Sequence, residues 1–133
     1  MTATIIGISL GIVIIMLFII FKQFDKKMIY GQILTAIGFL YVGFAWNDAV
    51  TLVINSIQAI AFLLLAYFGI KGRLSILALG FFLHGCWDMT YKLFRDPAMI
   101  PPHYDWFCLS IDYVFCIYIL IFKKQFAGVN TGA

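Results

Sequence analysis

One histidine and two aspartates lie in segments that are otherwise apolar enough to cross a membrane. His84 and Asp88 are four residues apart, so a helix places them on one face, and Asp112 lies in the next apolar segment. An ionisable group near the bilayer centre costs at least ~2.5–3.5 kcal/mol, so each needs a reason to be there. A desolvated carboxyl group can hold or release a proton. Asp88, Asp112 and His84 are therefore candidate catalytic residues, with an aspartate as general acid or base and the histidine orienting or relaying.

Further polar side chains are expected at the same depth. At ~1.5 Å per helical residue, Asp88 lies ~9 Å from the outer end of its helix, Asp112 lies ~10 Å below Asp105, and Asn55 lies ~7–8 Å into its helix. This coincidence predicts one polar pocket in the outer half of the membrane, opening outward beneath residues 96–104. The candidate ligand-binding residues are Asn55, Gln58, Trp87, Tyr91, Asp48 and His103.

Each candidate also has a purely structural explanation. His84 and Asp88 can form a buried pair that only locks helices together. The amides of Asn55 and Gln58 are common links between membrane helices. Asp48 is most simply a turn residue and helix cap.

The same applies to the remaining candidates. Asp112 can pair with Arg95 or Lys92 near the outer interface. Trp87 can belong to an aromatic belt, and His103 can simply be exposed in its loop. None of these explanations accounts for the shared depth of the polar residues, which favours a functional pocket.

Composition determines the environment of these residues. Of the 133 residues, 64% are hydrophobic and 11% are charged, against roughly 25% charged in a soluble domain. Too little polar surface exists to cover an ordinary globule, so membrane lipids must be part of the solvent. The net charge of +3 is small, and no basic patch interleaves with polar loop residues, so nucleic acid is not an expected partner.

Five apolar segments position the polar residues. They cover residues 4–21, 28–46, 50–70, 74–94 and 104–122. Short connections force neighbouring helices to run antiparallel, which predicts an all-α, up-down bundle of five transmembrane helices forming a single domain over residues 1–133. The Gly/Asn/Thr-rich tail after residue 124 is expected to be disordered. No motif predicts a cofactor.

The basic residues indicate the orientation of the bundle. Alternate connections place seven of the nine on one side, namely Lys22, Lys26, Lys27, Lys71, Arg73, Lys123 and Lys124, and leave Lys92 and Arg95 on the other. By the positive-inside rule the first side is cytoplasmic. The N-terminus is then outside and the C-terminus is cytoplasmic in a multi-pass protein of the cell membrane.

Two smaller patterns concern packing. Gly7 and Gly11 form a GxxxG pattern in the first segment, which permits close helix contact either within the monomer or in a homodimer. Cys86, Cys108 and Cys116 have no metal-binding spacing and are expected to be free packing thiols.

The C-terminal part of the chain carries a short motif. It runs from His84-Gly-Cys-Trp-Asp88 through Ile100-Pro-Pro-His-Tyr104 to Asp112. In this motif the last 30 to 40 residues resemble a family of small bacterial multi-pass membrane proteins of unknown function. The family often has a second histidine where this chain has Tyr91. The resemblance implies a bacterial plasma-membrane protein and brings no activity with it.

Several functions fit these residues. The leading hypothesis is binding or acid–base transformation of a hydrophobic, lipid-like small molecule in the outward-facing pocket. A second is metal-assisted hydrolysis, with His84, Asp88, Asp112 and His103 as ligands. A third is transport, which is disfavoured because the inner halves of the helices are nearly free of polar residues. A fourth is a non-catalytic accessory subunit of a membrane complex, so whether the protein is an enzyme stays open.

Overall fold

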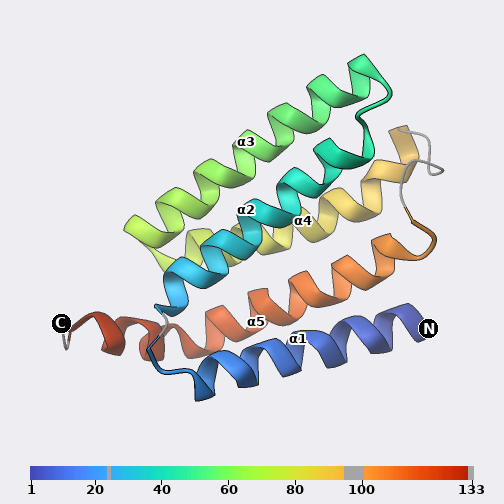
Figure 1. Ribbon diagram of the computed structural model, residues 1–133. Helices are drawn as coiled ribbons and strands as arrows, with labels where there is room; N and C mark the ends of the chain where they lie inside the picture. Colours follow the sequence, from blue (N-terminus) through green and yellow to red (C-terminus); the bar gives the residue numbers. More distant parts are fainter. Residues whose placement is uncertain (24, 95–100, 132–133) are drawn as a thin grey trace.

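The computed structural model describes residues 1–23, 25–94 and 101–131, and the chain forms five α-helices joined by short connections (Figure 1). These are α1 (Thr2–Ile20), α2 (Lys26–Phe44), α3 (Ala49–Lys71), α4 (Leu74–Phe94) and α5 (Tyr104–Thr131). The all-helical class and the five predicted helices are confirmed. The ends of the first four helices and the start of the fifth lie within two residues of the predicted bounds.

The C-terminal segment differs from the prediction. The backbone leaves the helical region at Phe122 (φ −105°, ψ 19°), where the helix was expected to end, but α5 then resumes and continues to Thr131. The expectation of a disordered tail was therefore wrong. The predicted end marked where the apolar run stops, and the end of an apolar run does not require the backbone hydrogen bonds of a helix to stop.

Consecutive helices run antiparallel, with the chain ends at opposite ends of the bundle (Figure 1). α1 packs against α5, α5 against α4, α4 against α3 and α2, and α2 against α3. α4 is therefore the helix that joins the two halves of the molecule. Polar side chains on α4 have neighbours from α2, α3 and α5.

Local sequence explains where α2 and α3 begin. Asp25 is the N-cap of α2, and its side chain accepts a hydrogen bond from the Lys27 amide at 3.0 Å. Asp48 caps α3 in the same way, accepting from the amide of Thr51 at 3.1 Å and from its hydroxyl. Each aspartate satisfies one of the free amides of a first turn.

Glycines allow two close approaches between helices. A Cβ added at Gly69 of α3 would lie 2.8 Å from the Leu77 Cβ of α4. A Cβ at Gly7 of α1 would lie 2.5 Å from the Phe107 carbonyl oxygen of α5, and one at Gly11 would lie 3.1 Å from Val114. The GxxxG face therefore packs inside the monomer, and it is not available to a second copy while α1 stays on α5.

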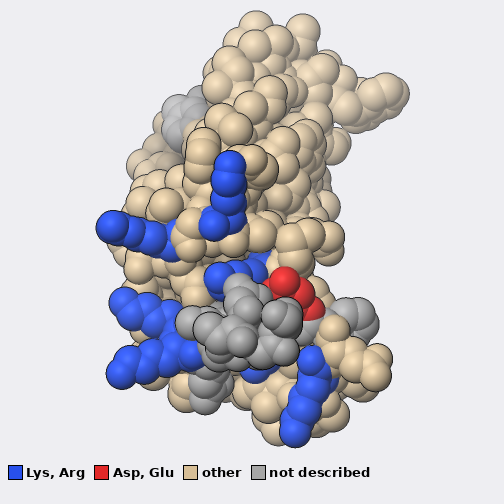
Figure 2. Space-filling model, turned by 90° about the vertical axis from the view of Figure 1, so that its left-hand side faces the viewer, with Lys and Arg blue, Asp and Glu red and all other residues tan. Residues whose placement is uncertain are grey.

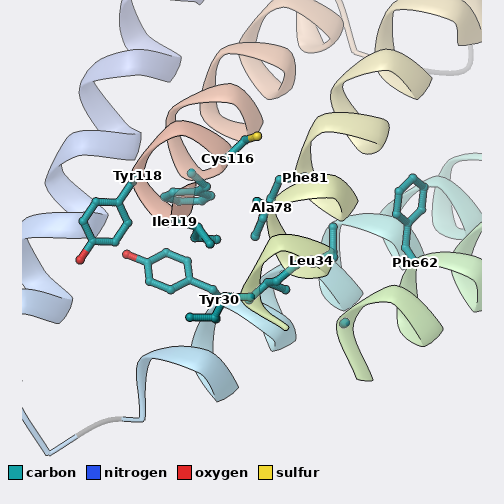
Figure 3. Packing of buried hydrophobic residues seen from close by; sticks show 12 residues of the cluster. Tyr30, Leu34, Phe62, Ala78, Phe81, Cys116, Tyr118 and Ile119 are labelled. Carbon is teal, nitrogen blue, oxygen red and sulfur yellow. The ribbon is translucent and has the colours of Figure 1, made fainter. Parts of the chain in front are cut away.

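The main apolar core fills the half of the bundle near the start of α2 and the end of α5. Figure 3 shows the Tyr30 ring of α2 pointing toward Tyr118 of α5, with Ile119 close by. Leu34 of α2 packs against α4, where a Cβ added at Gly80 would clash with its side chain. A second cluster, centred on Tyr41 and Tyr91, lies toward the other end. The polar residues of the candidate site belong to the half with the second cluster.

Four helices are long and apolar enough to cross a membrane: Thr2–Ile20, Lys26–Phe44, Ala49–Lys71 and Tyr104–Lys124. This indicates a membrane protein. Counted over the described residues, α4 is not among the four.

Basic side chains gather at one end of the bundle. Figure 2 looks onto this end and shows lysines and arginines around its rim, with little acidic surface between them. The antiparallel order brings the end of α1, the start of α2, the α3–α4 turn and the Lys123–Lys124 part of α5 to this end. The predicted grouping of seven basic residues on one side is therefore present in the fold.

Candidate functional site

His84 and Asp88 of α4 and Asp112 of α5 form one buried cluster. The His84 Nδ1 atom lies 2.8 Å from an Asp112 carboxylate oxygen and 3.4 Å from an Asp88 carboxylate oxygen. The exposed fraction is 0% for His84 and Asp88 and 1% for Asp112. The structure thus brings the three candidate catalytic residues together, in a closed cluster rather than on the wall of an open pocket.

Helix geometry explains the arrangement. His84 and Asp88 share one face of α4 at i and i+4 spacing, and that face packs against α5. Gly85 allows the approach, since a Cβ there would lie 2.7 Å from the Tyr113 ring of α5. The close contact between α4 and α5 is therefore what brings Asp112 within hydrogen-bond distance of the imidazole.

The contribution of α2 to the cluster is Tyr41, which sequence reasoning missed. Its hydroxyl donates a hydrogen bond of 2.5 Å to the second oxygen of Asp88, and the side chain is fully buried. Tyr91 was the one tyrosine among the sequence-predicted candidates, because it continues the helical face of His84 and Asp88, whereas Tyr41 has no ionisable neighbour of this kind on α2. The available signal was spacing: Tyr41 follows Leu34 by seven residues and Gly38 by three, so it lies on the face of α2 that also carries Tyr30.

α3 contributes Asn55, which links three helices. Its amide nitrogen donates to the Tyr41 backbone carbonyl at 2.7 Å and to the Tyr91 hydroxyl at 3.1 Å. The Tyr41 and Tyr91 rings also pack together, with centroids 4.8 Å apart. Asn55 therefore holds α2 and α4 in the register that places the Tyr41 hydroxyl on Asp88.

The two imidazole nitrogens of His84 have different surroundings. Ionised carboxyl groups only accept hydrogen bonds, so with Asp112 and Asp88 ionised it is Nδ1 that carries a proton and donates it. Nε2 is buried and has no hydrogen-bond partner among the described residues. When a carboxylate accepts the hydrogen bond from Nδ1–H, the other nitrogen, Nε2, is left to exchange protons with a ligand.

A hollow of about 380 Å³ lies between α3 and α4 beside the cluster. Its lining residues are Gln58, Ala61, Phe62, Leu65, Leu83, Cys86, Trp87 and Thr90. Two of the candidate ligand-binding residues, Gln58 and Trp87, thus line one cavity. Tyr91 and Asn55 lie instead in the hydrogen-bonded layer behind it.

The other two candidates lie apart from the cluster. Asp48 is half-buried and caps α3. This is the structural role, a helix cap, that the sequence analysis gave as the alternative to ligand binding. His103 is exposed, adopts a left-handed backbone conformation (φ 62°), and lines a different hollow with Met1, Thr4, Ile5 and Trp106. The expected roof over the pocket falls partly on residues 95–100, which lie outside the described residues.

The cluster also has the composition of a metal-binding group. One ligand atom from each of His84, Asp88 and Asp112 lies within 4.8 Å of the others. The two negative charges of the carboxylates would balance the charge of a divalent cation. Tyr41 donates a hydrogen bond to one of these carboxylates, as residues behind metal ligands commonly do. His103 is not a member of this group.

The fold and the site together define a small helical membrane protein with a buried His–Asp–Asp centre shared between α4 and α5. No curated protein and no solved structure matches the chain. A family model, described as a family of unknown function (DUF6010), matches residues 2–125. The chain belongs to this family, whose match covers nearly its whole length.

Proposed function

We propose that this protein binds a hydrophobic, lipid-like small molecule within the membrane and acts on it by acid–base chemistry at His84. The observation that carries the proposal is the state of the imidazole. Asp112 and Asp88 hold Nδ1, while Nε2 is buried with no hydrogen-bond partner in the described structure. A buried polar atom without a partner is costly, and its retention is explained if a ligand meets it.

In this proposal each side chain has a distinct role. His84 exchanges the proton with the ligand through Nε2. Asp112 orients the imidazole and stabilises its charged form, and Asp88, itself held by Tyr41, shares that task. An isomerisation or a cyclisation moves protons within one apolar molecule and needs no further group, and a hydration needs in addition only a water molecule as the second reactant.

The membrane placement is part of the proposal. All five helices span the bilayer, and α4, with 21 residues, is about 31 Å long and sufficient for this. The basic end is cytoplasmic by the positive-inside rule, which puts the N-terminus outside and the C-terminus inside, and the family resemblance favours the bacterial plasma membrane. The His–Asp–Asp cluster then lies in the outer half of the membrane.

The test is native mass spectrometry of protein purified in mild detergent, with lipid extraction from the same sample. We expect the wild type to carry a hydrophobic molecule that is absent from His84→Gln and Asp112→Asn. Asp105→Asn makes the same chemical change on α5 outside the cluster and should retain the molecule. Variants that stay folded and carry the molecule as the wild type does would refute the role of the cluster, and variants that no longer fold, with no molecule ever found, would make it structural.

A divalent metal centre is a second candidate, favoured by the three ligand atoms that lie within 4.8 Å of one another. Metal analysis of the same sample decides it. One equivalent of zinc, lost in Asp88→Asn, would favour a metal-dependent hydrolase. A sample with neither metal nor bound molecule would favour an accessory subunit of a membrane complex.

A further inference from the structure

The hollow between α3 and α4 combines an apolar wall with one unsatisfied polar side chain. Most of its lining is aliphatic or aromatic, from Ala61, Leu65 and Leu83 to Phe62 and Trp87. Gln58 also lines it and is 6% exposed, yet neither its amide nitrogen nor its amide oxygen has a hydrogen-bond partner among the described residues. A buried amide offers donors and an acceptor at once, so its natural complement is a polar group that both gives and takes hydrogen bonds.

Two walls of the hollow are shared with the buried cluster. The Phe62 ring lies 4.9 Å from the His84 ring, centroid to centroid. The Trp87 ring lies 6.2 Å from the ring of Tyr41, which binds Asp88. A molecule in the hollow is therefore separated from the imidazole by a single aromatic side chain.

We propose that this hollow is the binding site for an apolar alcohol, whose hydroxyl group pairs with the Gln58 amide and whose hydrocarbon part lies between α3 and α4. This inference rests on the proposed function and names its substrate class. The size of the hollow fits one small molecule rather than a helix, since ligand pockets typically measure about 300–1,000 Å³. Ala61 and Leu83 are exposed on its rim, so the alcohol reaches it sideways from the lipid.

Photo-crosslinking tests the site directly. The probe is a fifteen-carbon alcohol with a diazirine in its chain and a terminal alkyne, added to the full chain in lipid vesicles. We expect crosslinks on the α3 and α4 residues that line the hollow. Gln58→Leu keeps the side-chain volume and removes the amide, so it should weaken capture of the probe about fivefold.

The controls use neighbouring positions. Gln32→Leu makes the same change at the second hollow, between α2 and α3, and should leave capture unchanged. Ala61→Trp fills the hollow and should abolish capture. Crosslinks in the hollow, combined with a co-purifying molecule that His84→Gln retains, would refute the acid–base function and leave this site standing, so the two failures are distinguishable.

A second measurement needs only the wild-type protein, so it tests the site even where the variants do not fold. Cys86 lines the hollow and is half-buried, whereas Cys108 and Cys116 are buried, so N-ethylmaleimide should modify Cys86 first. The unlabelled alcohol should slow this modification in the wild type. Crosslinks confined to the α2–α3 hollow or to the hollow around His103 would overturn the proposal, as would a Cys86 reaction that the alcohol does not slow.

Discussion

At the scale of single residues, the Tyr41 hydroxyl determines how Asp88 is held. Asp88 has one oxygen bound by Tyr41 and the other facing His84. Because all three side chains are buried, no solvent replaces a lost partner. Removing one partner from such a group costs more than the hydrogen bond itself was worth.

Tyr41→Phe should therefore destabilise the protein by about 1–3 kcal/mol, since it leaves an Asp88 oxygen buried without its donor. Equilibrium unfolding in mixed detergent measures the change. Tyr67→Phe, at an exposed position on α3, is the matched control and should change the free energy of unfolding by less than about 0.5 kcal/mol. Equal effects of the two variants would contradict the role given to Tyr41.

The double variant Tyr41→Phe/Asp88→Ala tests the pair itself. Residues that share one hydrogen bond show coupling energies of about 0.5–3 kcal/mol in a double-mutant cycle. We expect the cost of losing the Tyr41 hydroxyl to shrink when Asp88 is already replaced by alanine, because the hydroxyl then has no acceptor to lose. Strict additivity of the two single changes would mean that the contact contributes nothing to stability.

At the scale of helices, α1 depends on α5 for its position. Only Gly7 and Gly11 of α1 are buried, and both lie against α5. The rest of α1 is apolar on every side, as expected for a helix with most of its surface in lipid. The contact through these two glycines, together with the packing of Ile14, Ile15 and Phe18 against the main core, fixes α1 on the bundle.

Gly7→Ala should weaken this contact, because the added Cβ would lie 2.5 Å from the Phe107 carbonyl oxygen and force the helices apart. Overpacking of this kind costs about 1–3 kcal/mol. Gly43→Ala is the control: a Cβ there meets nothing within 4 Å, and alanine in a helix should stabilise it by about 0.5–1 kcal/mol. Unfolding measurements in which Gly7→Ala is as stable as Gly43→Ala would show that α1 does not pack as described.

At the scale of the whole molecule, charge is distributed unevenly along the bundle axis. Basic side chains gather at the end where the α1–α2 and α3–α4 connections lie, and the His–Asp–Asp cluster lies toward the other end. In the proposed orientation the cluster faces the outer leaflet. This placement separates any chemistry at His84 from the cytoplasmic surface.

Cysteine labelling tests the orientation. With Cys86, Cys108 and Cys116 replaced by serine, Pro102→Cys should react with a membrane-impermeant maleimide on intact cells, because this exposed position lies at the end opposite the basic side chains. Gln23→Cys, exposed in the α1–α2 connection, should react only after permeabilisation. The reverse pattern would invert the topology and move the cluster to the inner leaflet.

The amino-acid sequence by itself determined the class of the protein, its five helices and the asymmetry of its basic residues. Apolar runs of membrane length, interrupted by Asn47-Asp48 and Lys71-Gly72-Arg73, leave little choice about where the helices lie. The depth of His84, Asp88, Asp112 and Asn55 was also predictable, because depth follows from counting residues along a helix. Counting along each helix therefore predicted that α3, α4 and α5 bring these polar residues to one layer.

Only the tertiary structure decided which polar groups meet, and the reason is that contact between helices depends on rotation as well as depth. Asp48 was expected in the pocket but caps α3, and the residue of α2 that reaches the cluster is Tyr41. His103 follows the turn into α5 and lies exposed beside Met1 and Trp106 rather than at His84. Which nitrogen of His84 is held, and that a hollow lies between α3 and α4, likewise follow from packing and are invisible in the spacing of residues along one chain.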